Sequence, residues 1–185
     1  EKIQEQDGSF YETKEKLTHS PQKWLQKEII IDRFYFTAAV PMRLFSLGYY
    51  DNPIINPALN WLKNNWNNWN IVAGTWYGAW ALLSLYPYEI GLPKTLFDQC
   101  YDYTLNWLPK LPSQPLTWLL DILIAAGYFF NDNLIIKGVE LLKKLQSEQG
   151  IWEDKKYSIT ETTVTAVRII ELYDRSEEIR IQGNE

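Results

Sequence analysis

A seven-position pattern, Gln-x-x-x-Gly-x-aromatic, occurs near both ends of the 185-residue chain and limits what the chain can fold into. The constant positions of the two copies are Gln4, Gly8 and Phe10, and Gln146, Gly150 and Trp152. A long Gln at a helix end can hydrogen-bond exposed backbone groups, and Gly accepts the left-handed conformation just past the helix. The aromatic ring then lies back over the closed turn. The pattern predicts a capped helix end in two places.

Helical patterns of two kinds alternate between these copies. Segments 33–47, 73–86, 116–128 and 161–173 form a mainly apolar set, whereas 56–66, 95–108 and 134–145 are amphipathic, with one apolar face. We expect the first kind to be inner helices and the second kind to be outer helices.

The segments also match one another in register. Residues 44–53 parallel 123–132, with Gly48 over Gly127, and 58–63 parallel 104–109. A helical hairpin cannot bury its apolar face alone, so repeats of this kind stack. The sequence predicts an all-α fold, an α/α toroid of helical hairpins whose ring is incomplete at about four inner helices.

The predicted organisation is one repeat domain over residues 1–185. It comprises the end of a truncated repeat (1–10), a loop (11–31), helical hairpins (32–173) and a tail (174–185).

Charge and hydropathy exclude several classes of function. The formal net charge of -5 and the lack of a Lys/Arg-rich block argue against a nucleic-acid surface. The single Cys100 forms no internal disulfide, which fits a reducing compartment. The apolar runs are short or interrupted, and residues 1–8 do not have signal-peptide character. We expect a cytoplasmic protein, with peripheral membrane contact left open.

The paired pattern resembles the QW motif of terpenoid cyclases, most closely the squalene-hopene and oxidosqualene cyclase group, and more weakly protein prenyltransferase beta subunits. The segment Gly74-Thr75-Trp76-Tyr77-Gly78-Ala79-Trp80 looks like the Gly-Ser-Trp-x-Gly-x-Trp segment of triterpene cyclases. The resemblance implies an α/α toroid that holds a polyprenyl or triterpene substrate, and an isomerase activity.

The catalytic motif of that family is missing. Its cyclases protonate an alkene with the middle Asp of Asp-x-Asp-Asp-Thr, and no Asp-x-Asp-Asp occurs in this chain. Asp121, inside an apolar run, and Glu161, at the head of the fourth inner segment, are the candidate catalytic carboxylates. The alternatives are a neighbouring helix end or solvent for Asp121, and a helix N-terminus for Glu161.

Four aromatic side chains are expected on inner helices: Trp76, Tyr77, Trp80 and Trp118. Aromatic faces suit a polyprene chain and stabilise carbocations as they do other cations. The same rings are equally suited to filling a core. We therefore predict an apolar, aromatic-lined ligand cavity, with core packing as the alternative for each ring.

Only one segment of the sequence looks like a cofactor site, and the cofactor would be zinc. Asp98-Gln99-Cys100-Tyr101 looks like the Asp-x-Cys-Tyr zinc segment of prenyltransferase beta subunits, but it lies on an expected outer helix. The only His, His19, lies far upstream, and catalytic zinc needs three protein ligands. We predict no metal and no cofactor, and a buried Cys100.

Two functions of different class follow. The first is a terpenoid-cyclase-like protein that binds or cyclises an isoprenoid; the second is a non-catalytic helical-repeat module that binds a lipid, a peptide or a partner protein. The toroid is expected to be too short to close, which predicts either a homo-oligomer or second subunit that completes the ring, or a segment or degenerate relative of a larger cyclase.

Overall fold

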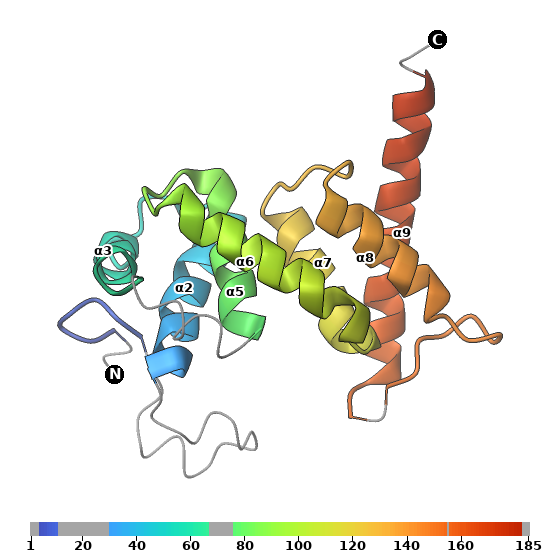
Figure 1. Cartoon of the computed structure of the whole chain (residues 1–185), viewed down its shortest axis with the longest axis horizontal. Helices are drawn as coiled ribbons and strands as arrows, with labels where there is room; N and C mark the ends of the chain where they lie inside the picture. Colours follow the sequence, from blue (N-terminus) through green and yellow to red (C-terminus); the bar gives the residue numbers. More distant parts are fainter. Residues whose placement is uncertain (1–3, 11–29, 67–75, 155, 183–185) are drawn as a thin grey trace. The chain divides into compact units, whose positions relative to one another are not determined.

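The computed structural model describes residues 4–10, 30–66, 76–154 and 156–182, although not the side chains of 30–32 and 76. Within these ranges the chain is all-α, as predicted: it contains seven α-helices and no strand (Figure 1). The helices are α2 (Ile30–Ser46), α3 (Ile55–Asn65), α5 (Trp76–Leu83), α6 (Lys94–Trp107), α7 (Ser113–Ala125), α8 (Asn133–Lys144) and α9 (Ile159–Gln182). Two short 3-10 helices, η2 (Tyr86–Tyr88) and η3 (Leu108–Lys110), follow α5 and α6.

The chain divides into two compact units, unit 1 (Glu1–Thr104) and unit 2 (Leu105–Glu185). In unit 1, α2 packs against both α3 and α5. In unit 2, α7 packs against both α8 and α9, and α8 also packs against α9. In each unit, an expected inner helix thus contacts an outer helix and the next inner helix.

Helices α2 and α7 end in the same way, at a glycine. Gly48 and Gly127 have φ angles of 81° and 91°, a left-handed conformation that costs glycine little. The N–H of Tyr49 donates to the carbonyl of Leu44 (2.9 Å), and the N–H of Tyr128 donates to that of Leu123 (3.0 Å). This shared helix end confirms the register match between 44–53 and 123–132.

Helix α8 shows how these elements pack. Asp132 caps its N-terminus by accepting a hydrogen bond from the N–H of Leu134 (2.8 Å). Its apolar face is buried and includes Leu142. A Cβ on Gly138 would lie 2.5 Å from Leu120 of α7, so the glycine permits the close approach of the two helices.

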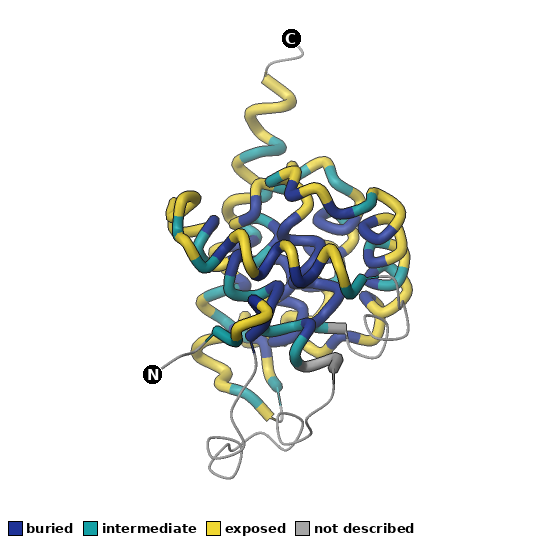
Figure 2. The backbone as a smooth tube through the Cα atoms, turned by 90° about the vertical axis from the view of Figure 1, so that its left-hand side faces the viewer, coloured by how far each residue is buried: buried dark blue, intermediate teal, exposed yellow. Residues whose placement is uncertain are grey.

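The last helix is longer than predicted. Helix α9 continues to Gln182, whereas the pattern predicted a helix over 161–173 and a tail from 174. Figure 2 shows that its C-terminal turns carry only exposed and intermediate residues. The extension has no apolar stripe facing a core, so hydrophobic periodicity did not indicate it. No helix in the described ranges is both long and apolar enough to cross a membrane.

Candidate functional site

The two QW-like turns are closed by the same hydrogen bonds. The side-chain amide of Gln4 donates to the carbonyl of Gly8 (2.9 Å), and that of Gln146 donates to the carbonyl of Gly150 (3.1 Å). In both turns the residue after the Gln donates its N–H to the carbonyl of the residue after the Gly, at 2.9 Å. The two glycines have φ angles of 92° and 79°. The predicted left-handed turn is therefore present in both copies.

The aromatic residue of each turn is anchored on a helix. Phe10 and Trp152 are buried, with 3% and 1% of their surface exposed. The N–H of Phe10 donates to the hydroxyl oxygen of Thr37 in α2 (2.9 Å), and that of Trp152 donates to the hydroxyl oxygen of Thr163 in α9 (3.2 Å). The first turn is thus joined to α2 and the second to α9.

One detail of the predicted turn is different. We expected the Gln side chain to satisfy the end of the preceding helix, but in the second copy the indole N–H of Trp152 donates to the carbonyl of Leu142 (2.7 Å), in the last turn of α8. The Gln146 amide closes its own turn instead. The indole of Trp152 takes the place expected for the Gln because a buried indole directs its single N–H donor at a nearby carbonyl.

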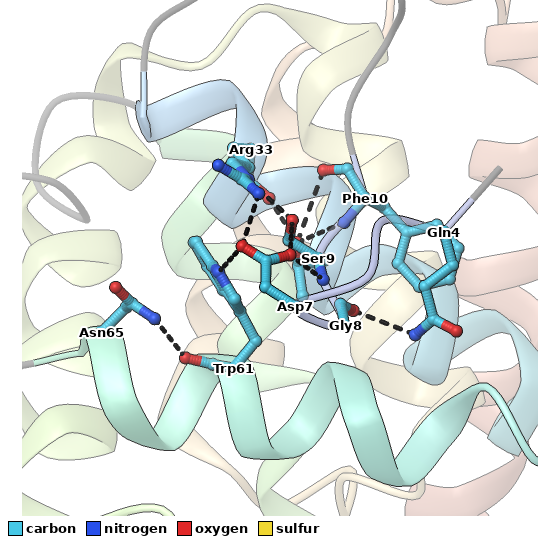
Figure 3. A network of polar contacts seen from close by, with 9 residues as sticks. Gln4, Asp7, Gly8, Ser9, Phe10, Arg33, Trp61 and Asn65 are labelled. Atoms are coloured by element: carbon cyan, nitrogen blue, oxygen red, sulfur yellow. Dashed lines mark hydrogen bonds and ion pairs between the residues drawn. The ribbon is translucent and has the colours of Figure 1, made fainter. Parts of the chain in front are cut away.

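The first turn carries a polar network that is not found at the second turn. We call it the Asp7 cluster, and it consists of Asp7, Ser9, Arg33 and Trp61 (Figure 3). One carboxylate oxygen of Asp7 accepts hydrogen bonds from the N–H (3.0 Å) and the hydroxyl (2.7 Å) of Ser9. The other accepts from the guanidinium of Arg33 (2.6 Å) and the indole N–H of Trp61 (3.2 Å). The cluster ties the turn to α2 and α3.

The cluster also sets the charge of Asp7. Burial raises the pKa of this carboxyl, but the hydrogen bonds from Ser9, the charge of Arg33 and the hydrogen bond from Trp61 outweigh burial and lower the pKa below its usual value. Asp7 is therefore ionised at neutral pH. Because both carboxylate oxygens of Asp7 accept hydrogen bonds from these donors, we interpret the cluster as structural.

A second group of chemically capable side chains lies on unit 2, which we call the α7/α9 face: Trp118, Asp121, Tyr157, Glu161 and Arg168. The carboxylate of Asp121 on α7 accepts a hydrogen bond from the guanidinium of Arg168 on α9. The ring of Trp118 lies edge-on to that of Tyr157, with centroids 5.2 Å apart. Glu161 precedes Arg168 by seven residues and so lies on the same side of α9.

The two carboxylates predicted to be catalytic are exposed to solvent. The side chain of Asp121 is 36% exposed, and Glu161 is exposed in the first turn of α9. The backbone N–H of Glu161 donates to the hydroxyl oxygen of Ser158 (3.3 Å), so the helix start is capped. A carboxylate in that first turn also favours the helix dipole.

The four predicted ligand-binding rings differ in environment. Trp80 is 2% exposed and belongs to the core of unit 1, and Tyr77 packs edge-on against Tyr35 at 4.9 Å. Trp118, in unit 2, is 36% exposed. The side chain of Trp76 lies outside the described residues. Of the three described rings Trp118 is the most exposed, and Tyr77 is half-buried.

Unit 1 contains a cavity that the sequence did not indicate. It has a volume of about 360 Å³ and lies where η2 leads into α6; its lining includes Tyr86, Glu89, Leu92, Lys94 and Phe97. The ammonium of Lys94 is paired with Asp98 at 2.7 Å. The lining comes largely from a loop without periodicity, so no sequence pattern pointed to it.

The zinc-like segment has the features of an ordinary amphipathic helix with one buried side. Cys100 is fully buried in α6, and burial raises the pKa of its thiol far above the usual value. Asp98 lies on the exposed side of α6, and His19 lies outside the described residues. Across the described part of the chain, no three His, Cys, Asp or Glu side chains come together as a metal site.

Comparison with known proteins gives no match to a family model, a curated protein or a solved structure.

Proposed function

We propose that this chain is a helical-hairpin repeat protein of the terpenoid cyclase and prenyltransferase type, with the hairpins arranged as an incomplete α/α toroid, and that it binds an isoprenoid ligand. The observation that carries the proposal is that the two turns are built in the same way. Gln4 and Gln146 each close onto a left-handed Gly, and the aromatic residue that follows is anchored on a Thr hydroxyl. Packing of inner helices on one another and on outer helices within each unit supports the same arrangement.

The ligand surface in this proposal is the α7/α9 face. Trp118, Ile122 and Ala125 follow one another at helical spacing along α7, and none of the three is buried. The ring of Tyr157 extends this stripe beyond Trp118. A stripe of aromatic and aliphatic side chains suits a flexible polyprene chain, which binds mainly through burial of apolar surface.

The setting of the acids favours binding over cyclisation. Protonation of an alkene needs a carboxylic acid that holds its proton in a site closed to water. Asp121 instead accepts a hydrogen bond from Arg168, and Glu161 is exposed. This proposal accordingly assigns binding to the α7/α9 face, and the catalytic roles predicted for Asp121 and Glu161 stay predictions.

The test is a titration with a farnesyl hydrocarbon, followed by isothermal calorimetry or ligand fluorescence. Trp118→Ala should weaken binding about tenfold, because it removes a large apolar contact worth roughly 1.4 kcal/mol or more. Trp107→Ala is the matched control, since Trp107 and Trp118 have nearly equal exposure, 37% and 36%. Absence of binding by the wild-type protein, or equal loss in both variants, would overturn the proposal.

A second candidate function is association with another copy of this chain. Val164 and Val167 lie three residues apart on one side of α9 and are 64% and 40% exposed. Exposed apolar side chains grouped on a helix mark interaction sites. Sedimentation equilibrium of the wild-type protein and of Val164→Glu tests this function: a larger species that the variant loses supports it, and a monomer in both rules out self-association.

A further inference from the structure

Asp7 and Gly8 form the only Asp-Gly pair in this sequence, which contains no Asn-Gly pair. Aspartate followed by glycine is especially prone to isomerise, because a residue without a Cβ leaves its backbone nitrogen open to the neighbouring carboxyl. The pair lies within the first QW-like turn, and Asp7 is the centre of the Asp7 cluster. The most reactive pair of the sequence is therefore part of a segment that is tied to two helices.

The reaction is an isomerisation that leaves the mass unchanged. The backbone nitrogen of Gly8 attacks Cγ of Asp7 and forms a C–N bond, while one carboxyl oxygen leaves as water with the N–H hydrogen and the carboxyl proton. Water then opens the succinimide ring by breaking a C–N bond. Breaking the new bond restores aspartate. Breaking the original peptide bond frees the backbone carbonyl as a carboxylate, and the chain then runs through Cβ and Cγ as isoaspartate.

In the folded protein the attacking nitrogen is bonded and enclosed. The N–H of Gly8 donates to the carbonyl of Glu5 (3.0 Å), and Gly8 is buried. A Cβ on Gly8 would lie 2.3 Å from the carbonyl oxygen of Pro57, so the turn lies directly against the backbone of α3. Attack requires the nitrogen to lose its hydrogen, and burial and hydrogen bonding oppose this step as they oppose amide hydrogen exchange.

The carboxyl of Asp7 is held as well. Its two oxygens accept hydrogen bonds from the N–H of Ser9 (3.0 Å), the guanidinium of Arg33 (2.6 Å) and the indole of Trp61 (3.2 Å). Burial raises the pKa of Asp7, but these donors outweigh burial and lower the pKa below its usual value. Because water leaves far more readily from a protonated carboxyl than from a carboxylate, the donors also oppose ring closure.

Isoaspartate does not fit the turn once it has formed. It adds one atom to the backbone between Asp7 and Gly8, and two hydrogen bonds span this point. The N–H of Glu5 donates to the carbonyl of Ser9 (2.9 Å), and the side-chain amide of Gln4 donates to the carbonyl of Gly8 (2.9 Å). The added atom moves both carbonyls out of register with their donors, and the close contact with α3 leaves no room for it.

We propose that the bond between Asp7 and Gly8 is the isoaspartate site of this chain, and that docking of the first turn through the Asp7 cluster keeps this site unreactive. The modification forms when the turn is detached from α2 and α3, and the modified turn does not dock again. Isoaspartate therefore accumulates with repeated opening of the turn. This site is independent of the isoprenoid binding proposed above, since the α7/α9 face belongs to unit 2.

The first test incubates the full chain at neutral pH, in buffer and in guanidinium chloride. Electron-transfer dissociation mass spectrometry of proteolytic peptides distinguishes isoaspartate from aspartate by its backbone fragments. In denaturant, isoaspartate should form at position 7 faster than at any other Asp or Asn. In buffer the rate at position 7 should be at least about tenfold lower, because only the opened turn reacts. Equal rates in the two solutions, or a faster site elsewhere in denaturant, would overturn the proposal.

The second turn supplies a matched control. Gln149 and Gly150 stand where Asp7 and Gly8 stand in the first turn, and the N–H of Gly150 donates to the carbonyl of Ser147 (2.9 Å). Gln149 and Gly150 are exposed, however, whereas Gly8 is buried. Gln149→Asp therefore places two Asp-Gly pairs in one molecule. In buffer, position 149 should isomerise at least about tenfold faster than position 7, and in denaturant at a similar rate. Equal rates in buffer would contradict protection by docking.

Two variants on α2 test the part played by the cluster. Arg33→Gln removes the cation that pairs with Asp7, and it should raise the rate at position 7 severalfold in buffer without changing it in denaturant. Arg43→Gln, at an exposed position of the same helix, should change neither rate. Circular dichroism confirms that both variants are folded, and the comparison of positions 7 and 149 decides the question without them. An unchanged rate in folded Arg33→Gln would refute the role of the cluster.

The last test concerns renewed docking. Protein that carries isoaspartate at position 7 is prepared in denaturant, refolded and followed by amide hydrogen exchange. The N–H of Phe10 donates to Thr37 in the unmodified protein (2.9 Å), and in the modified protein it should exchange at least about tenfold faster. Equal protection of this amide in the two proteins would mean that the modified turn docks, contrary to the proposal.

Discussion

Thr37 and Thr163 hold the same position relative to two separate turns: the hydroxyl oxygen of each accepts a hydrogen bond from the N–H of the buried aromatic residue that ends the turn. Thr37 also donates to the carbonyl of Arg33 (2.7 Å), one helical turn earlier. A threonine hydroxyl therefore links the turn to α2 in unit 1 and to α9 in unit 2.

Replacement of these hydroxyls should destabilise the protein. Thr37→Val keeps the shape of the side chain but leaves the buried N–H of Phe10 unpaired, which costs about 1–3 kcal/mol. Thr163→Val should cost less, since Thr163 is only half-buried and its bond is longer, at 3.2 Å. Urea unfolding measures both. Thr37→Ser retains the acceptor and should recover most of the loss; a Thr37→Val protein as stable as wild type would contradict this account.

The two glycines of the turns should respond differently to alanine. A Cβ on Gly8 would lie 2.3 Å from the carbonyl oxygen of Pro57, whereas one on Gly150 would meet nothing closer than Gln146 Nε2, at 3.8 Å. Both substitutions force a left-handed alanine, which costs about 1–2 kcal/mol. Gly8→Ala adds a backbone clash and should lower the thermal midpoint clearly more than Gly150→Ala. Equal midpoints in the two variants would show that the first turn does not press against α3 as described.

The Asp7 cluster should make the free energy of unfolding depend on pH in the acidic range. The pKa of Asp7 is lower in the folded protein than in the unfolded chain, whose value is 3.8, so the unfolded chain binds the proton more readily. Ionised Asp7 therefore stabilises the folded state, and this stabilisation is fully present above pH 3.8. The effect is lost as pH falls through the lower pKa of the folded state. We expect wild type to exceed Asp7→Asn in unfolding free energy at pH 6, with the gap closing below about pH 4. Asp51→Asn, at an exposed position, serves as control, and a gap that stays constant down to pH 2 would argue against ionic stabilisation.

Cys100 should be inert in the folded protein. Burial excludes reagents and raises the pKa of the thiol, so little thiolate forms at pH 8. Mass spectrometry after iodoacetamide treatment should show no alkylation in buffer and complete alkylation in denaturant. Rapid modification of the native protein would mean that α6 opens readily.

The roles of the two acids are decided by product analysis. We expect farnesyl or squalene-type ligands to be recovered unchanged after long incubation with the wild-type protein. If a cyclic product does form, its loss in Asp121→Asn or Glu161→Gln would assign the proton donor, with Asp132→Asn as a control away from the α7/α9 face. Unchanged ligand together with normal binding agrees with a binding protein.

Local pattern predicted the helices and the turns, because both depend on residues close in sequence. Helices α3, α6 and α8 begin and end within about one residue of the predicted positions, since their apolar faces have a clear 3.6-residue period. The left-handed Gly8 and Gly150 were predictable for the same reason.

Contacts between distant residues were not predictable in this way. The Asp7 cluster joins Asp7 to Arg33 and Trp61, 26 and 54 residues away, and no periodicity relates these positions. The partner of Asp121 was missed because Arg168 lies 47 residues later, on another helix. The lack of a described donor to Gln114 Oε1 and Asp154 Oδ2 was not predictable either, since the pairing of a buried oxygen depends on residues distant in sequence.

The anchoring of the two turns bears on the order in which the chain folds. Trp152 finds its partners 10 and 11 residues away, in α8 and α9, whereas Phe10 and Asp7 must meet partners 27 and 54 residues away. Closing a longer loop costs more entropy and slows the search for native contacts. The second turn should therefore dock early in folding and the first late, so that a pulse-labelling experiment would find the Trp152 amide protected before that of Phe10.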